Sequence, residues 1–124
     1  MPHVVFDNEI DLECFSQGFT ELIQTKPFLI KLLDVFLDRK KKIALGPVVV
    51  IDKLHQQFLI EITTRKNKTT VRLFPGTDPE KTDGVKMSLG LTAKMISEKN
   101  PSHKITKTNI EDFLSADTSK IVLT

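Results

Sequence analysis

The chain begins Met1-Pro2-His3-Val4-Val5-Phe6-Asp7, with a proline directly after the initiator methionine and an apolar run behind it. Val4, Val5 and Phe6 are β-branched or aromatic, so the run predicts a β-strand at the N-terminus. Methionine before a small residue such as Pro2 is normally removed, which would leave a secondary amine at the end of a buried strand. The alternative is that Pro2 merely opens an edge strand, where its missing N–H costs little.

Length and composition indicate one globular domain spanning residues 1–124. A chain of 124 residues is long enough to bury a hydrophobic core without disulfide or metal crosslinks. With 40% hydrophobic and 27% charged residues, its composition is that of an ordinary globular protein. The formal net charge of +2 points to no particular partner. Cys14 is the single cysteine, so an intrachain disulfide is impossible. With no signal peptide and no 18-residue apolar run, the sequence predicts a cytoplasmic protein that does not cross a membrane.

The segment after the first strand is predicted to be helical, because its apolar residues recur at spacings close to three and four. They are Phe15, Phe19, Leu22, Ile23, Ile30, Leu33 and Leu37. Pro27 predicts either a kink or the start of a second helix at this point. The segment ends in Asp38-Arg39-Lys40-Lys41-Lys42, which places cations where a helix C-terminus favours them.

Three strands are predicted in the middle of the chain. Ile43 to Ile51 is continuously apolar and β-branched, which predicts a strand buried on both faces. Pro47 favours a bulge or an edge position within it. Gln57 to Thr64 alternates and pairs with Thr69 to Phe74 as a hairpin around Arg65-Lys66-Asn67-Lys68.

A helix is predicted from Thr82 or Asp83 to Lys99, ended by Asn100-Pro101. Gly84 and Gly90 weaken it by up to about 1 kcal/mol each. After it, Lys104 to Thr108 favours a strand, residues 108–114 favour a capped helical turn, and Ile121-Val122-Leu123 favours a short terminal strand.

These elements predict an α+β fold, with one sheet and helices packed on one face. A strand, helix and strand joined in this way would be parallel and right-handed. A small open sheet leaves strand edges bare, so we expect an oligomer.

The order of elements, with a Met-Pro start running straight into a strand, resembles the tautomerase superfamily. Within it, Met1-Pro2-His3 is similar to the start of the 5-carboxymethyl-2-hydroxymuconate isomerase-like branch. The stretch from Pro101 through Ile105 to Ile121-Val122-Leu123 resembles the end of the macrophage migration inhibitory factor-like branch. The resemblance implies two β-α-β units forming one sheet with helices on one face, in a trimer with a pocket at each interface. The break at Pro27 and the hairpin arm over Arg65–Phe74 depart from the family.

The resemblance also implies a chemistry. Pro2, exposed by removal of Met1, would be the general base of a keto–enol tautomerase or isomerase. An α-amino group titrates near 8, and burial or nearby cations lower that pKa, so a neutral amine could move a proton next to a carbonyl. Lys41, or Lys42 beside it, and Arg65 would bind the anion of a small carboxylate-bearing substrate. If Met1 is retained, Pro2 is an amide and cannot act as the base.

A second class of function stays open, namely a non-catalytic oligomeric α+β binding module, either of unknown ligand or with a basic patch for nucleic acid. Arg39–Lys42 and Arg65–Lys68 would form one patch if the two segments lie together. The near balance of acidic and basic residues and the lack of Trp and Tyr disfavour nucleic acid. The three histidines and Cys14 have no metal-ligand spacing and no phosphate loop is present, so neither a metal nor a cofactor is expected.

Overall fold

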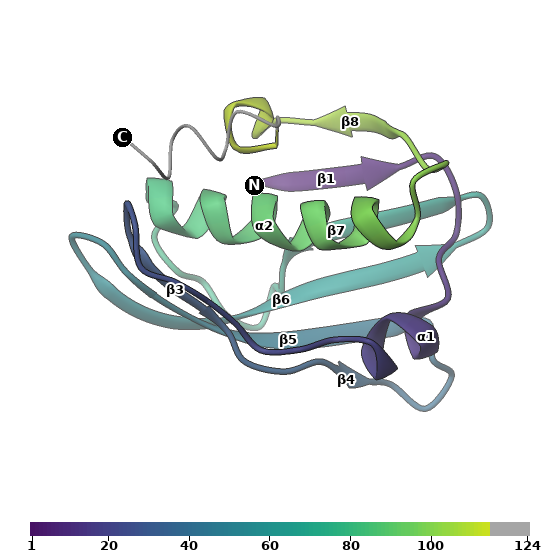
Figure 1. The fold of residues 1–124 in the computed structure, drawn as a ribbon, viewed down its shortest axis with the longest axis horizontal. Coiled ribbons are helices and arrows are strands. Elements are labelled where there is room, and N and C mark those ends of the chain that lie inside the picture. The colour runs from purple at the N-terminus through teal and green to yellow at the C-terminus, as the bar shows by residue number, and fades with distance from the viewer. Residues whose placement is uncertain (115–124) are drawn as a thin grey trace.

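A strongly curled antiparallel sheet encloses one long helix in the computed structural model, which describes residues 1–114 (Figure 1). The elements in chain order are β1 (His3–Phe6), α1 (Leu12–Gln17), β2 (Leu22–Gln24), β3 (Leu29–Leu32), β4 (Phe36–Leu37), β5 (Ile43–Ile51), β6 (His55–Arg65), β7 (Lys68–Leu73), α2 (Asp83–Lys99), β8 (Ile105–Thr108) and the 3-10 helix η1 (Glu111–Phe113). The sheet therefore forms a half-barrel, and α2 lies across its concave side.

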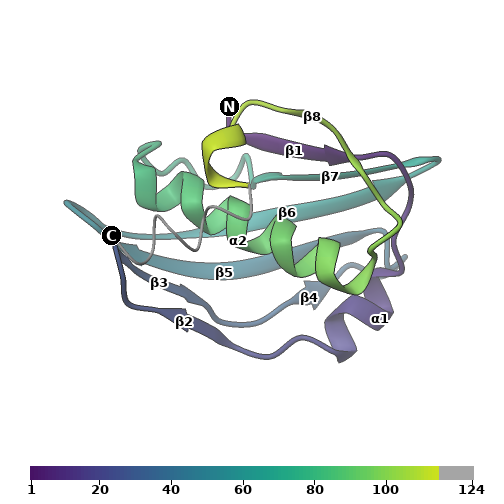
Figure 2. The same cartoon turned by 45° about the horizontal axis from the view of Figure 1, so that its top comes forward.

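The strands follow the order β2-β3-β5-β6-β7-β1-β8, and β4 adds to β5 beside β3. Every pairing is antiparallel. Figure 2 shows this order from β8 at one edge to β2 at the other, with α2 held inside the curve. The first strand closes the sheet against β7 and β8, which come from the second half of the chain.

The predicted fold of two β-α-β units with helices packed on one face is wrong. The consecutive strands that pair (β2–β3, β4–β5, β5–β6 and β6–β7) are joined by short turns and are therefore antiparallel, and β1 pairs with neither β2 nor β3. The parallel crossover expected between the first two strands does not form, because the residues predicted as the crossover helix themselves form strands. The architecture implied by the resemblance to the tautomerases is therefore not that of this chain.

The long helix predicted over Phe15 to Leu37 is reduced to the six residues of α1. Beyond Gly18 the chain forms the β2–β3 hairpin and β4. In β3, Ile30 and Leu32 are buried while their neighbours are half-buried, which is the alternation of a strand. Apolar residues four positions apart lie on one face of a helix, but because four is an even number they also lie on one face of a strand. Pro27 in addition interrupts any helix in this region. Pairing with β5 decided between the two periods.

The strand predicted at Ile43 to Ile51 is confirmed as β5, but only one of its faces is buried. Ala44, Val48 and Val50 point into the core, whereas Ile43 and Ile51 at its two ends are exposed. At Pro47 the neighbouring strand changes from β3 to β4, and the Pro47 carbonyl accepts a hydrogen bond from the Leu33 amide. The missing N–H therefore faces the gap between two neighbours, so a proline fits a central strand without a bulge.

The strands predicted near residues 4–6, 57–64, 69–74 and 104–108 are confirmed as β1, β6, β7 and β8, and the second helix is confirmed as α2. The turn predicted within residues 108–114 is η1. The terminal strand predicted at residues 121–123 lies outside the described residues.

The core lies between α2 and the concave side of the sheet. Its fully buried side chains come from both layers: Val4, Phe6, Ile30, Val50, Val71, Leu73, Val85, Leu89, Ala93 and Ile96. Gly90 lies on the side of α2 that faces η1, and a Cβ atom there would be 2.1 Å from the Phe113 carbonyl oxygen. The glycine that weakens the helix in isolation is thus the residue that lets η1 approach it.

We expect Gly90→Ala to lower the free energy of unfolding by about 1–3 kcal/mol, because overpacking against Phe113 outweighs the higher helix propensity of alanine. Urea denaturation measures this difference. Lys94→Ala, at an exposed position of the same helix, is the matched control and should stay within about 0.5 kcal/mol of wild type. Equal stability of the two variants would show that η1 yields without cost.

Asp52 connects the β5–β6 turn to the start of α2. Its carboxylate accepts hydrogen bonds from the amides of Leu54 and Gly84, each at 3.0 Å. Partial burial pulls the pKa of Asp52 upward, but the hydrogen bonds from the Thr82 side chain and these amides outweigh it and hold the pKa below its ordinary value. The ionised carboxylate therefore stabilises the fold above pH about 4, and this contribution is lost as the pH falls through the lowered pKa.

Asp52→Asn should cost about 1 kcal/mol at neutral pH and should make the free energy of unfolding less dependent on pH below about pH 4. Denaturation curves recorded between neutral and acidic pH test both effects. Glu98→Gln, at an exposed position of α2, serves as the control for removing a carboxylate. Parallel pH profiles for wild type and Asp52→Asn would contradict the assignment.

Candidate functional site

The two basic segments of the sequence meet at one end of the sheet. Ile43 at the start of β5 is opposite Thr63 of β6, and the Thr64 amide donates to the Lys42 carbonyl at 3.0 Å. This register places Arg39–Lys42 beside the β6–β7 turn, where Arg65 is opposite Lys68. Figure 1 shows the β4–β5 and β6–β7 turns at the same end of the molecule. Arg39–Lys42 and Arg65–Lys68 therefore lie together, which was the condition for a single basic patch.

Asp38 shapes the β4–β5 turn. Its Oδ1 accepts hydrogen bonds from the Lys42 amide at 2.8 Å and from the Ile43 amide at 3.0 Å. The hydrogen bond from Ile43, followed by those of the neighbouring amides, lowers the pKa of Asp38. Lys41 takes a positive φ of 59° at the tip of the turn. The carboxylate therefore fixes the direction in which the adjacent lysines leave the backbone.

A shallow open hollow of about 660 Å³ lies between the two turns. Five cations line it against two carboxylates, with the remaining positions taken by Ile43, Thr63 and Thr64. The cations are Arg39, Lys40, Lys42, Arg65 and Lys66, and the carboxylates are Glu9 and Asp38. The net charge of the whole chain is only +2, but the positive charges gathered here give the hollow a local positive potential.

A second hollow of about 240 Å³ continues from the first along the outer face of β6 and β7. The two share Thr63 and Arg65, and the second adds Lys68, Thr70 and Arg72. Arg72 is already engaged, because its Nε donates to Glu61 Oε1 at 2.7 Å. Together the two hollows form an elongated surface of cations and hydroxyls, which we call the basic groove.

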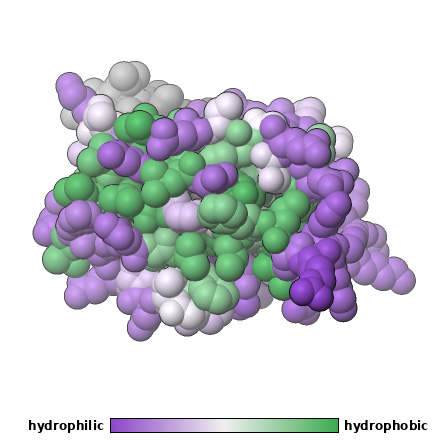
Figure 3. Space-filling view, turned by 90° about the horizontal axis from the view of Figure 1, so that it is seen from below, coloured by the Kyte–Doolittle hydropathy of each residue, from purple (hydrophilic) through white to green (hydrophobic). Residues whose placement is uncertain are grey.

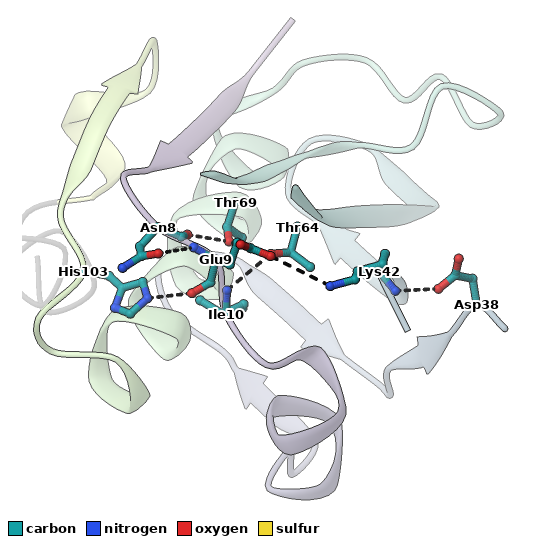
Figure 4. Close-up of polar contacts among 8 residues, drawn as sticks. All are labelled: Asn8, Glu9, Ile10, Asp38, Lys42, Thr64, Thr69 and His103. Atoms are coloured by element: carbon teal, nitrogen blue, oxygen red, sulfur yellow. Dashed lines mark hydrogen bonds and ion pairs between the residues drawn. The ribbon is translucent and has the colours of Figure 1, made fainter. Parts of the chain in front are cut away.

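A network of polar contacts holds the inner wall of the basic groove (Figure 4). Thr69 Oγ1 donates to the Asn8 carbonyl at 2.8 Å, and Thr64 Oγ1 accepts from the Ile10 amide at 3.3 Å. His103 Nε2 donates to the Glu9 carbonyl at 2.7 Å. With its backbone fixed on both sides, Glu9 places a carboxylate oxygen 3.8 Å from Lys42 Nζ. These contacts position the loop before α1 so that Glu9 offsets part of the charge of one lysine.

The three residues predicted from the resemblance are not brought together. Arg65 lines the basic groove, but Lys41 forms an ion pair with Glu13 of α1, whose hydrogen bond and charge raise the pKa of Lys41. Pro2 is buried just before β1, at the end of that strand where His3 pairs with Arg72. Since Arg65 pairs with Lys68 at the other end of β7, Pro2 and Arg65 are about 14–17 Å apart along the strands.

The sequence offered either Lys41 or Lys42 as an anion-binding residue, and of the two it is Lys42 that lines the basic groove. The contributions of Thr63, Thr70 and Arg72 were missed, because they depend on which strand residues share a face. Their alternation along Thr63–Arg65 and Thr70–Arg72 was the available signal. The catalytic role of Pro2 stays a prediction. It would be supported by a tautomerase activity of the wild-type protein that the Pro2→Ala variant lacks.

An apolar cavity between α1, α2 and the sheet has room for about one water molecule, at about 20 Å³. Phe15, Phe19 and Met95 are among its walls. In this state it is too small for a carboxylate-bearing substrate. Within residues 1–114, no three His, Cys, Asp or Glu side chains are grouped to hold a metal ion. In the same part of the chain, no helix is both long and apolar enough to cross a membrane.

Comparison of the chain with family models, curated proteins and solved structures finds no match. The residues and their geometry are therefore the basis for assigning a function.

Asp38→Ala should loosen the β4–β5 turn, because the Lys42 and Ile43 amides lose their shared acceptor. We expect hydrogen exchange of these two amides to become about tenfold faster, because neither amide is then held by an acceptor in the turn. Nuclear magnetic resonance resolves the individual amides. Asp38→Asn keeps an oxygen acceptor and should retain most of the protection, so equal loss in both variants would contradict this account.

Proposed function

We propose that this protein is a non-catalytic module that binds the phosphate backbone of a nucleic acid along the basic groove. The observation that supports this proposal is the gathering of Arg39, Lys40, Lys42, Arg65 and Lys66 around one open hollow. Backbone phosphates are the regularly spaced anions that such a surface fits, and cation contacts to them supply sequence-independent affinity.

The side chains along the basic groove favour phosphate over base recognition. Arginine offers a planar pair of N–H donors to phosphate oxygens, and lysine adds a mobile point charge. Thr63 and Thr70, which lie opposite each other on β6 and β7, add hydroxyl donors. The lining residues include no aromatic side chain on which a base could stack. The binding we infer is thus electrostatic and tolerant of sequence.

The openness of the basic groove supports a binding role rather than an enclosed reaction. General acid–base chemistry depends on a titratable group held close to a substrate from which water is excluded. The basic groove is instead shallow, and its two carboxylates are committed to structural contacts: Asp38 to the turn and Glu9 to Lys42. Such a surface retains a ligand through several weak charge contacts.

Fluorescence anisotropy with a labelled single-stranded RNA and a labelled DNA duplex tests the proposal. With three or four phosphate contacts, the logarithm of the binding constant should fall with the logarithm of salt concentration with a slope of about −2 to −4. Arg65→Ala and Lys42→Ala should each weaken binding of every sequence and reduce the magnitude of the slope by about 1. Glu9→Gln, which removes a carboxylate from the wall, should tighten binding severalfold.

Lys94→Ala is the matched control, because Lys94 is exposed on α2 and contributes to neither hollow. It should leave affinity and slope nearly unchanged. Affinity that does not depend on salt, or an equal effect of Lys94→Ala and Arg65→Ala, would contradict the basic groove as the binding site. If the protein binds heparin but neither nucleic acid, the basic groove is the site of a different polyanion and the proposed ligand is wrong.

A further inference from the structure

The second hollow of the basic groove is built on three residue pairs that face each other across β6 and β7. In order along the strands they are Arg65 with Lys68, Thr63 with Thr70, and Glu61 with Arg72. Successive pairs are two residues apart, so all six side chains lie on the outer face of the sheet. The hydroxyl pair is therefore in the middle, with charged pairs about 7 Å away along the strands on each side.

Glu61 is buried although it carries a charge and lies on the outer face. Its side chain is 8% exposed, and its Oε1 accepts a hydrogen bond from Arg72 Nε at 2.7 Å. A buried ion pair adds little to stability compared with apolar side chains, so stability alone does not explain a carboxylate at this position. Its effect is on Arg72, because an acceptor at Nε fixes the plane of the guanidinium.

Arg72 keeps donors for a further acceptor. Its side chain is 42% exposed and lines the second hollow. Within residues 1–114, no atom of this side chain other than Nε forms a hydrogen bond. The two terminal amino groups of a guanidinium form a planar fork that matches two oxygens of a phosphate. Glu61 and Arg72 together therefore present a fork of fixed orientation to the hollow.

The other cations of the second hollow are not neutralised. Its lining includes Arg65, Lys68 and Arg72 but no carboxylate. In the described part of the chain, neither Arg65 nor Lys68 forms an ion pair, although like charges opposite each other destabilise a sheet. Even with Glu61 counted against Arg72, two positive charges remain around a hollow of about 240 Å³. This surplus suits a small ligand with two negative charges.

The basic groove ends at the second hollow along β6 and β7. Beyond Glu61, the next outward residue of β6 is Leu59, and Leu45 of β5 lies opposite Glu61. Figure 3, which views the molecule from the side of β4 and β5, shows apolar residues gathered over the middle of this face and hydrophilic residues at both ends. Val5 of β1 borders the hollow on the other side, opposite Thr70. A strand that follows the basic groove from the first hollow therefore reaches its last cation of β6 and β7 here.

We propose that the second hollow binds a phosphate monoester, namely the terminal phosphate at one end of a nucleic-acid strand. A monoester carries about −1.5 to −2 charge at neutral pH and three terminal oxygens, whereas a backbone phosphate carries a single charge. The fork of Arg72 binds two oxygens, and the hydroxyls of Thr63 and Thr70 donate to the third. Arg65 and Lys68 balance the charge. This site rests on the proposed function, since the first hollow holds the adjoining backbone.

Fluorescence anisotropy with matched single-stranded RNAs tests the monoester site. A 5′-phosphate and a 3′-phosphate are each compared with the hydroxyl at the same end, with the label at the opposite end. We expect one of the two phosphates to tighten binding about tenfold. Arg72→Lys keeps the charge but removes the fork, and should reduce this gain to about twofold. Lys107→Ala is the matched control, because Lys107 is exposed on β8 opposite Val5 and lines neither hollow, so the gain should persist.

A pair of variants tests Glu61 as the positioning residue. Glu61→Leu should lower the gain, because Arg72 loses the acceptor of its Nε, and Glu61→Gln should restore most of it because an oxygen acceptor is kept. The readout is the ratio of the affinities for phosphate-ended and hydroxyl-ended strands, which a general loss of folded protein does not change. Circular dichroism verifies the fold of each variant.

The possible outcomes separate this site from the proposed function. Equal affinity for phosphate-ended and hydroxyl-ended strands would overturn the monoester site while the proposed function stands. If no strand binds, but inorganic phosphate shifts the amide resonances of Thr63 and Thr70 in wild type and not in Arg72→Lys, a nucleic-acid end is overturned as the source of the monoester and the proposed function is wrong. A gain that Lys107→Ala removes as fully as Arg72→Lys would overturn the second hollow as its place.

Discussion

The pairing of β5 with β6 is the interaction on which the rest of the molecule depends. All nine residues of β5 are matched in register, from Ile43 opposite Thr63 to Ile51 opposite His55. Because side chains alternate along a strand, this one register decides which residues of both strands enter the core. A slip by one residue would turn Val48, Val50 and Ile60 toward solvent. The remaining strands add to the two sides of this pair, and α2 closes its inner face.

The same register produces the chemistry at the end of the sheet. Since Ile43 is opposite Thr63, the turn before β5 and the turn after β6 must lie together, and both are rich in lysine and arginine. Two segments more than twenty residues apart in the sequence thus form one basic groove. The loop before α1 is then fixed against them through Thr64, Thr69 and His103. The electrostatics of the basic groove are therefore a consequence of backbone pairing.

Segments with a single dominant pattern could be predicted from the sequence. The hairpin of β6 and β7 alternates clearly around a turn, and α2 has a cap at Thr82, a long apolar stripe and a stop at Asn100. The region from Phe15 to Leu37 has no such pattern, because its apolar spacings fit a helix and a strand about equally well. Predicting a crossover helix in this region led to a parallel β-α-β topology, whereas the strands that form there are joined by short turns and pair antiparallel.

The sequence by itself determined the composition of the two basic segments, the strands β5 to β7 and the helix α2, because local propensity and periodicity are properties of neighbouring residues. Only the tertiary structure decided that these segments meet, that Lys42 and Arg65 share a groove while Lys41 pairs with Glu13, and that Pro2 lies far from both. The physical reason is that strand pairing is a contact between residues distant in the chain. Its register is set by how the whole set of apolar side chains is buried, which no local stretch of the sequence contains.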